Sequence, residues 1–560
     1  MKTRFLCISL AILFTNSITL NAQNALKATK KTNTASPAYP QAIARPKLVV
    51  GMVIDQMRWD YLYRFYSRYG QGGFKRILHD GFSAENTLIP YTPTKTACGH
   101  SSIYTGSVPA INGIIGNNWF DPQLGRDVYC VEDKDVKTVG SPSKEGLMSP
   151  KNLLVTTVTD ELRMATNFRS KVISVSIKDR GAILPGGHTA NGSYWYDDKM
   201  GNFITSTHYM QQLPTWVNDF NAQKLPNKYF EKDWNTLYPI ETYTESTADS
   251  KTYEQLFKGE KTSTFPHLFK QYANKNYSMM GSMPYGNTLT LELAKAAIPA
   301  EKLGQTKNTD FLAVSLSSTD YVGHQFGPNS IEIEDTYLRL DKDLEDFFTY
   351  LDKTIGKGNY LLFLTADHGG THVPGFSKEN KMPGAGLAPK KFKKALDSLI
   401  FKEFNAKNTI FTIINDQLIF DKDAIKEANA DYGKIKQLAI DYLTKQEGIL
   451  NAVDIKNLAN ATIPQEIKNK ITNGYNARRS GDIYIILNPG WYPSLSPGTG
   501  HGAWNPYDSH IPALFMGWGI KPGKTNKEYY MTDIAPTVSA LLHIQQPSGS
   551  IGKVITELME

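Results

Sequence analysis

The stretch KLVVGMVIDQ, residues 47–56, decides the fold class of this 560-residue chain. Leu48–Ile54 is a continuous apolar run, rich in β-branched residues, and it is followed directly by the carboxylate of Asp55. Three later stretches have the same form: KVISVSIKD (171–179), DFLAVSLSSTD (310–320) and NYLLFLTADHG (359–369). Continuous apolar strands, unlike alternating ones, are typical of a parallel sheet whose two faces are covered by helices. The sequence therefore predicts an α/β fold with a mostly parallel central sheet and helices on both faces.

Helical patterns follow these strands. IEIEDTYLRLDKDLEDFFTYLDKTIGKG (331–358) repeats its apolar residues at helical spacing and ends at Gly356 and Gly358. Near the C-terminus, the strand-like DIYIILNP (482–489) and IPALFMGWG (511–519) and the helix-like TDIAPTVSALLHI (532–544) continue the alternation. We expect the ligand site at the carboxyl ends of the strands, where an open α/β sheet places it.

Changes in composition divide the chain. We predict a core from residues 47–185, 310–378 and 481–560, interrupted by two cap insertions. The first insertion, 186–309, is rich in Tyr, Asn, Thr and Gly, whereas the second, 379–480, is rich in Lys and carries its own strand and helix signals. Residues 23–46 lack periodicity and are predicted to form a flexible leader.

The first residues indicate export. Lys2 and Arg4 precede an apolar run, Phe5–Phe14, and Ala22 ends the segment, which is the pattern of a signal peptide over residues 1–22. No later segment is a long uncharged apolar run, so we expect no membrane span and a periplasmic location, with release from the cell left open. Removing the signal lowers the formal charge from +7 to +5. The sequence has no dense Lys/Arg block, so we expect no nucleic-acid partner.

Acidic and imidazole side chains follow the predicted strands. The set comprises Asp55, Asp320, His324, Asp367, His368 and His501. Three carboxylates and three imidazoles suit zinc, and a catalytic zinc takes about three protein ligands with one position open. Six ligands can therefore serve two Zn²⁺ ions, with a seventh oxygen from a serine or threonine. PTKTACGHSSIYTG (93–106) offers several hydroxyls and the thiol of Cys98 for that place.

The same residues carry a resemblance. TKTACGHSSIYTGSVPAINGIIGNNW (94–119), SIKDRGAILPGG (176–187), SSTDYVGHQFGP (317–328), TADHGG (365–370) and GTGHG (498–502) resemble the motifs of the alkaline phosphatase superfamily. The likeness is strongest to its exported, phosphate-irrepressible bacterial phosphatases, and it runs from about Lys47 to about His543. It implies that Asp320, His324 and His501 hold one zinc.

By the same resemblance, Asp55, Asp367, His368 and the Thr96 oxygen hold the second zinc. Thr96, rather than Thr92, Thr94, Cys98 or Ser101, is then the nucleophile and forms a phosphothreonine intermediate. The fold implied is alkaline-phosphatase-like.

The resemblance also bears on the substrate. Asn117, Lys178 and Arg180 match a trio that holds the oxygens of a phosphate monoester, and Asn117 is preferred to Asn118 by its distance from Thr96. Lys178 and Arg180 are two residues apart after an apolar strand, so an extended backbone would point both toward the site. The dianion of a monoester invites more cationic donors than a diester does.

The leading interpretation is therefore an alkaline phosphatase that hydrolyses small-molecule phosphate monoesters, and we expect it to be a monomer. Two alternatives remain open. One is a phosphodiesterase or nucleotide pyrophosphatase of the same superfamily, and the other is a non-catalytic exported binding protein that uses the Tyr-rich insertion. The sequence also leaves open whether Cys98 and Cys130 form a disulfide.

Overall fold

A computed structural model describes residues 44–495 and 497–559. The predicted signal peptide 1–22 lies outside the described residues, as does the leader up to residue 43. Arg45–Glu560 forms one unit by its internal contacts.

Among the described residues, the centre of this unit is an 11-stranded sheet. Its strands follow in the order β15 (His510–Ile511), β2 (Phe82–Leu88), β16 (Ala513–Gly517), β10 (Tyr360–Thr365), β1 (Leu48–Ile54), β9 (Asp310–Leu316), β6 (Val172–Ser176), β7 (Gly192–Asp197), β8 (Asn202–Ser206) and β5 (Thr138–Val139), and β17 (Gly523–Tyr530) pairs with β2. The block β10-β1-β9-β6-β7 is parallel, while β16 and β8 join it antiparallel. The prediction of a mostly parallel sheet is confirmed.

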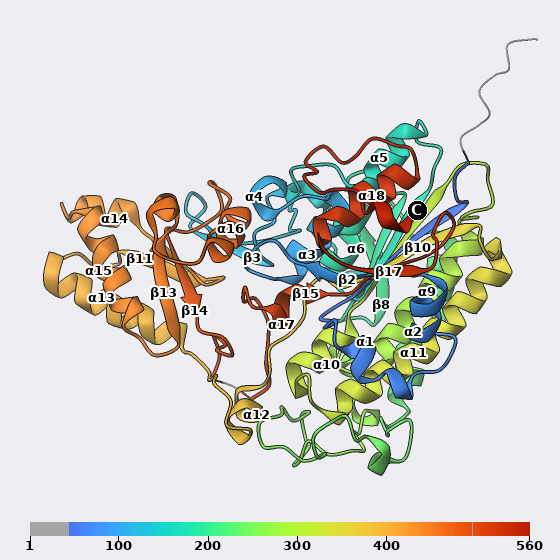
Figure 1. The fold of residues 1–560 in the computed structure, drawn as a ribbon, viewed down its shortest axis with the longest axis horizontal. Coiled ribbons are helices and arrows are strands. Elements are labelled where there is room, and N and C mark those ends of the chain that lie inside the picture. Colours follow the sequence, from blue (N-terminus) through green and yellow to red (C-terminus); the bar gives the residue numbers. More distant parts are fainter. Residues whose placement is uncertain (1–43, 496, 560) are drawn as a thin grey trace, which may run out of the picture. The chain divides into compact units, whose positions relative to one another are not determined.

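Helices cover both faces of the sheet (Figure 1). On one face, α3 (Thr96–Thr105), α5 (Val158–Ala165), α6 (Asp179–Gly186) and α18 (Ile534–Leu541) pack together, and α6 lies on β6, β7 and β9. On the other face, α9 (Tyr285–Ala300) packs on β9 and β6, and α11 (Ile331–Leu351) packs on α9. Every residue of β1 and β9 is buried between these layers. Burial on both faces explains why these strands are apolar throughout.

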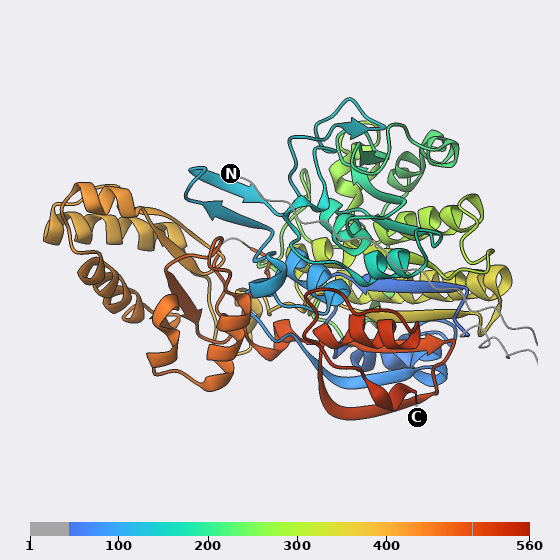
Figure 2. The same ribbon diagram turned by 90° about the horizontal axis from the view of Figure 1, so that it is seen from above.

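A separate four-stranded sheet has the order β11 (Ile410–Ile414), β12 (Gln417–Phe420), β14 (Ile483–Leu487) and β13 (Ile449–Asp454). Three of these strands lie in the second predicted insertion, 379–480, whereas β14 lies beyond its predicted end. Helices α13 (Pro389–Phe404) and α15 (Tyr432–Thr444) cover this sheet, and Leu396, Leu418 and Ile435 lie in its own apolar core (Figure 2). The strand DIYIILNP, which we predicted for the main sheet, is β14. That prediction is wrong, because β14 pairs antiparallel with β12 and β13 in the smaller sheet.

The first predicted insertion, 186–309, also shares elements with the core. Strands β7 and β8, at its start, extend the main sheet, and α9, near its end, covers that sheet. Of this range, the residues between β8 and α9 contain only short helices among those described, including α7 (Thr215–Ala222) and α8 (Leu225–Phe230). The residues that could form a separate cap are therefore fewer than the composition suggests.

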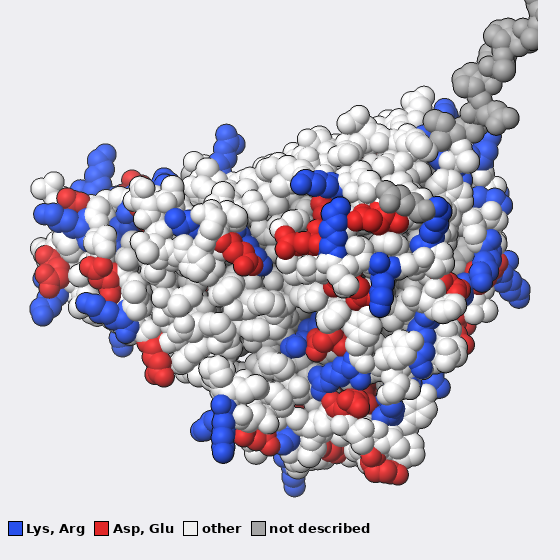
Figure 3. Space-filling view, viewed as in Figure 1, with Lys and Arg blue, Asp and Glu red and all other residues white. Residues whose placement is uncertain are grey.

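The charged side chains are mixed over the face shown in Figure 3, with Lys and Arg interspersed among Asp and Glu. None of the described helices is both long enough and apolar enough to cross a membrane.

Candidate active site

The predicted ligands meet at the carboxyl edge of the parallel strands. Asp55 follows β1, Asp367 and His368 follow β10, and the helix after β9, α10 (Ser318–Phe326), carries Asp320 and His324. His501 comes from the loop between β14 and β15. The structure thus brings together all six residues that the strand-end pattern selected.

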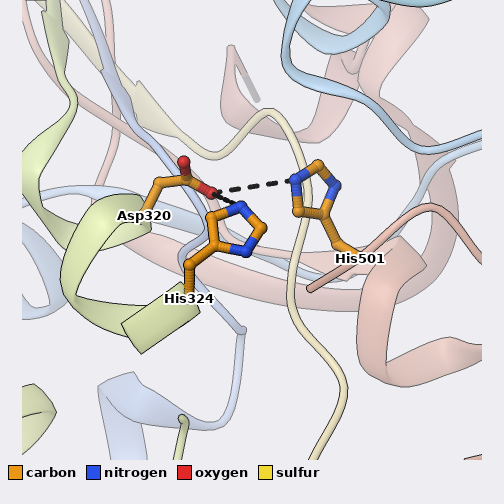
Figure 4. A group of neighbouring side chains, drawn as sticks. All are labelled: Asp320, His324 and His501. Atoms are coloured by element: carbon orange, nitrogen blue, oxygen red, sulfur yellow. Dashed lines mark ion pairs between the residues drawn. The ribbon is translucent and has the colours of Figure 1, made fainter. Parts of the chain in front are cut away.

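The first ligand group consists of Asp320, His324 and His501 (Figure 4). Asp320 Oδ1 lies 3.2 Å from His324 Nε2 and 3.8 Å from His501 Nε2. The other ring nitrogens are held by backbone carbonyls, with His324 Nδ1 at 2.8 Å from Thr499 O and His501 Nδ1 at 2.6 Å from Thr94 O. Because Nδ1 donates to a carbonyl, Nε2 keeps a lone pair that points into the group. This is the orientation that a metal-binding histidine needs.

The second group surrounds His368. Its Nε2 atom lies 3.5 Å from Asp55 Oδ1, 3.4 Å from Asp367 Oδ2 and 3.4 Å from Thr96 Oγ1. Its Nδ1 atom lies 2.9 Å from Gly369 O, so the tautomer again leaves Nε2 free to bind a metal. Burial lowers the pKa of His368 and so favours the neutral ring.

Both groups fit a divalent cation. Among the described residues, Asp55 Oδ1 and Asp367 Oδ2 are buried oxygens without a hydrogen-bond partner. Burial, together with the nearby charges of Asp320 and Asp367, raises the pKa of Asp55 well above its usual value. Lys178 supplies one positive charge, with Nζ 2.6 Å from Asp55 Oδ2 and 2.5 Å from Asp320 Oδ2. Three buried carboxylates therefore face a single ammonium group, and the remaining negative charge and free oxygens match a metal site.

Thr96 is the first residue of α3 and is almost completely buried. The N-terminus of a helix favours a bound anion. Gly99 allows the close approach of α3 to the ligands, because a Cβ atom there would lie 2.4 Å from Asp367 O. The Thr96 hydroxyl therefore lies at the edge of the second ligand group.

The competing side chains in the same stretch have other contacts. Thr92 Oγ1 lies 2.8 Å from Tyr484 Oη, Thr94 Oγ1 donates to Ala503 O, and Ser101 Oγ donates to Cys98 O. Cys98 is fully buried, and burial raises its pKa to about 12, so its thiol stays protonated. Cys98 and Cys130 are both free thiols in the structure, which answers the question that the sequence left open.

Asn117 lies next to Thr96. Its Oδ1 atom accepts a hydrogen bond of 2.9 Å from the backbone N–H of Ala97, while Asn118 begins strand β3 (Asn118–Asp121) and its carbonyl accepts from Asn415 Nδ2. The structure therefore places Asn117, and not Asn118, against the start of the Thr96 helix.

Our expectation that Lys178 and Arg180 lie on an extended strand end is wrong. Strand β6 stops at Ser176, Lys178 is the extended N-cap residue of α6, and Arg180 lies in the first turn of that helix. Both cations still lie near Tyr321: its pKa is raised by burial, and the charges of Lys178 and Arg180 oppose that rise. Lys178 Nζ is 5.0 Å from the centre of the Tyr321 ring.

Two residues that the sequence reasoning overlooked support the ligands. Fully buried His100 lies four residues after Thr96, and its Nδ1 atom is 3.0 Å from Thr96 O and 3.3 Å from Asp367 Oδ2. Gln56 donates from its backbone N–H to Asp367 Oδ1 and from Nε2 to Asp320 Oδ1. The spacing of four in the helix could have pointed to His100, since positions i and i+4 share a face.

The remaining histidines lie outside the ligand groups. His79 is exposed, His188 contacts Asp160, His208 contacts the carbonyl of His188, His267 lies between Glu260 and Glu332, His372 contacts Asn329, His510 contacts the carbonyl of Glu85, and His543 follows α18. Each has a structural contact or an exposed position that accounts for it.

His100→Asn should lower the affinity of the site for a divalent metal ion about 10- to 100-fold, the range for residues that orient metal ligands. The reason is that His100 Nδ1 binds the carbonyl of Thr96 and lies beside Asp367 Oδ2, so it orients the first turn of α3 against this carboxylate. Metal content at increasing metal concentration checks the prediction. His510→Gln is the matched control, and equal metal affinity of the two variants would contradict a supporting role for His100.

Comparison with known proteins places this site in a family. The profile of the type I phosphodiesterase / nucleotide pyrophosphatase family matches residues 49–510. The chain is 82% identical to alkaline phosphatase PhoV of Synechococcus elongatus over 560 residues, covering 100% of both chains. It is 52% identical to alkaline phosphatase PafA of Elizabethkingia meningoseptica, over 92% of this chain and 95% of PafA.

The fold agrees with this result. The crystal structure of wild-type PafA superposes with a TM-score of 0.91 at 52% identity and covers 93% of this chain and 100% of PafA. The resemblance that the sequence motifs indicated is confirmed. The chain belongs to the type I phosphodiesterase / nucleotide pyrophosphatase family, within the alkaline phosphatase superfamily.

Proposed function

We propose that the protein is an alkaline phosphatase that hydrolyses phosphate monoesters and releases inorganic phosphate. The observation that carries the proposal is the pair of ligand groups beside the buried hydroxyl of Thr96. The names of the relatives at 82% and 52% identity, both alkaline phosphatases, support the same activity.

We infer two Zn²⁺ ions as the cofactors. Asp320, His324 and His501 would hold one, and Asp55, Asp367, His368 and the Thr96 oxygen would hold the other. Nitrogen ligands mixed with carboxylates favour zinc over magnesium or calcium, which prefer oxygen ligands alone. When bound, such a pair of ions stabilises the negative charge on the attacking and leaving oxygens of a displacement at phosphorus.

The chain's own residues perform the rest. Thr96 Oγ1 attacks phosphorus, the P–O bond to the alcohol or phenol breaks, and a phosphothreonine forms. Water then attacks the phosphorus of that intermediate and the bond between Thr96 Oγ1 and phosphorus breaks. Inorganic phosphate leaves, and a proton from the water regenerates the Thr96 hydroxyl. Asn117, which contacts the start of α3, would bind the non-bridging oxygens together with Lys178 and Arg180. The N-terminus of α3 also favours this anion.

The phosphodiesterase description of the family profile supports a second candidate, the hydrolysis of diesters. The two candidates differ in the charge of the group that is bound. A monoester dianion has one more anionic oxygen than a diester, so the cations Lys178 and Arg180 stabilise it more strongly.

Replacing Arg180 with alanine should therefore lower kcat/KM for an aryl phosphate by on the order of 10²-fold, since a charged hydrogen-bonding partner is lost. It should leave kcat/KM for the methyl diester of the same phenol within about twofold. Rates of the wild type and of Arg180→Ala with both substrates check this. A wild type that prefers the diester would overturn the monoesterase proposal.

Export is a further part of the proposal. The signal-peptide pattern of residues 1–22 supports a periplasmic protein. We also propose that the protein is a monomer. Cell fractionation followed by N-terminal sequencing tests both the location and cleavage after Ala22.

A further inference from the structure

Arg180 is held by a tyrosine from another part of the chain. Tyr129 ends strand β4 (Arg126–Tyr129), and its hydroxyl accepts a hydrogen bond of 3.0 Å from Arg180 Nη1. The same hydroxyl donates to Asp179 Oδ1 at 2.5 Å. Asp179 itself lies 3.8 Å from Arg180 Nη1, so the phenol oxygen is the nearer of the two contacts.

The direction of these hydrogen bonds is fixed. Burial, with the nearby charge of Asp179, raises the pKa of Tyr129 well above its usual value, so the phenol stays protonated although Arg180 opposes the rise. Its single proton goes to the carboxylate, and a lone pair then faces the guanidinium group. Asp179 Oδ1 is in turn held by the backbone N–H of Arg180 at 2.6 Å. Tyr129, Asp179 and Arg180 therefore form a closed set of contacts.

The opposite edge of the guanidinium group stays available. Arg180 Nε is buried and has no hydrogen-bond partner among the described residues. A guanidinium group whose Nη1 atom is hydrogen-bonded within the protein can still donate from Nε and Nη2. These two atoms form a bidentate donor that matches two oxygens of a phosphoryl group. A buried N–H donor without a hydrogen-bond partner destabilises the folded protein, so a ligand that accepts this hydrogen bond is favoured at this edge.

The position of Tyr129 is linked to that of Asn117. Strands β3 and β4 form a hairpin in which Asn118 pairs with Tyr129, and Cys130 N–H donates to Asn117 O at 2.9 Å. Asn117 contacts the start of the Thr96 helix, as described above. The β3–β4 hairpin thus connects Asn117, which contacts the start of the Thr96 helix, with Tyr129, which contacts Arg180.

We propose that Tyr129 is a positioning residue that orients Arg180 toward the extra anionic oxygen of a phosphate monoester. The proposal rests on the proposed function, in which Arg180 binds that oxygen. It makes the β3–β4 hairpin a determinant of the preference for monoesters over diesters.

A double-mutant cycle tests the proposal. In Tyr129→Phe, kcat/KM for an aryl phosphate should fall about tenfold, the effect of losing one hydrogen bond to a charged group. For the methyl diester it should stay within about twofold, and inhibition by inorganic phosphate should weaken in parallel with the monoester rate. In the Arg180→Ala background, Tyr129→Phe should change the monoester rate less than about twofold, because its partner is absent.

Matched variants separate positioning from folding. Tyr194→Phe removes the hydroxyl of another buried tyrosine, on β7, and should leave both rates unchanged. Asp179→Ala should resemble Tyr129→Phe, since the phenol then loses the oxygen that accepts its proton.

Four outcomes would overturn the inference. Equal losses with both ester types, or a Tyr129→Phe effect that persists without Arg180, would indicate a merely structural role. An Arg180→Ala enzyme with wild-type monoester activity would overturn both this inference and the substrate contact proposed for Arg180. A strong Arg180→Ala effect with an unaffected Tyr129→Phe would overturn only the role of Tyr129.

Discussion

Thr96→Ala should lose monoesterase turnover by on the order of 10³-fold or more, because removing a nucleophile removes the covalent route. The Thr96 hydroxyl is the one in its stretch that contacts the second ligand group, with Oγ1 3.4 Å from His368 Nε2. Stopped-flow or steady-state rates with an aryl phosphate measure the loss.

Neighbouring substitutions supply the controls. Cys98→Ala should keep turnover within a few-fold of the wild type, since the thiol is buried and protonated. Thr96→Ser keeps a hydroxyl and should retain much more activity than Thr96→Ala. If Cys98→Ala were inactive and Thr96→Ala active, the choice of nucleophile would be wrong.

Removal of the metal ions should cause the second large loss of turnover. Dialysis against EDTA should lower turnover below about 1% of its starting value, because metal ions supply much of the stabilisation of charge at phosphorus. Added Zn²⁺ should restore turnover, and elemental analysis should find about two zinc ions per active chain.

Single ligand variants sharpen this test. Asp320→Asn removes the carboxylate that His324 and His501 face, so bound zinc should fall by about one ion per chain. His510→Gln, which lies outside both ligand groups, should keep the full zinc content. Unchanged zinc content in Asp320→Asn would show that this residue is not a ligand.

Much of the sheet could be predicted because its pattern is local. The runs that end before Asp55 and Asp367 are buried on both faces, so every position is apolar and the strand can be identified without its partners. Five of the six candidate ligands follow from the same pattern, since strand ends of a parallel block meet at one edge. His501 does not, because it comes from the loop between β14 of the smaller sheet and β15.

Features that depend on distant pairing could not be predicted in the same way. DIYIILNP is apolar enough for either sheet, and only its pairing with Gln417–Phe420 and Ile449–Asp454 assigns it to the smaller one. Strands Gly192–Asp197 and Asn202–Ser206 likewise join the main sheet in spite of their polar composition.

In the site, too, features that depend on contacts between distant residues could not be predicted. Arg180 was expected on a strand because an apolar run precedes it, but α6 begins at Asp179, immediately after Lys178. The contact between Arg180 and Tyr129 joins residues that are 51 positions apart, and no local sequence pattern predicts it. The strand-end pattern does not select His100, because this residue lies inside a helix, although its spacing of four residues from Thr96 indicates a shared helix face.

The most direct test of the central claim is to identify the phosphorylated residue during turnover. The wild-type enzyme would be mixed with an aryl phosphate, quenched in acid at successive times, digested and analysed by mass spectrometry. The account predicts phosphate on Thr96, at a level that rises and then falls as substrate is consumed. Phosphate on any other residue, or an unmodified Thr96 at every time in an enzyme that turns over, would contradict it.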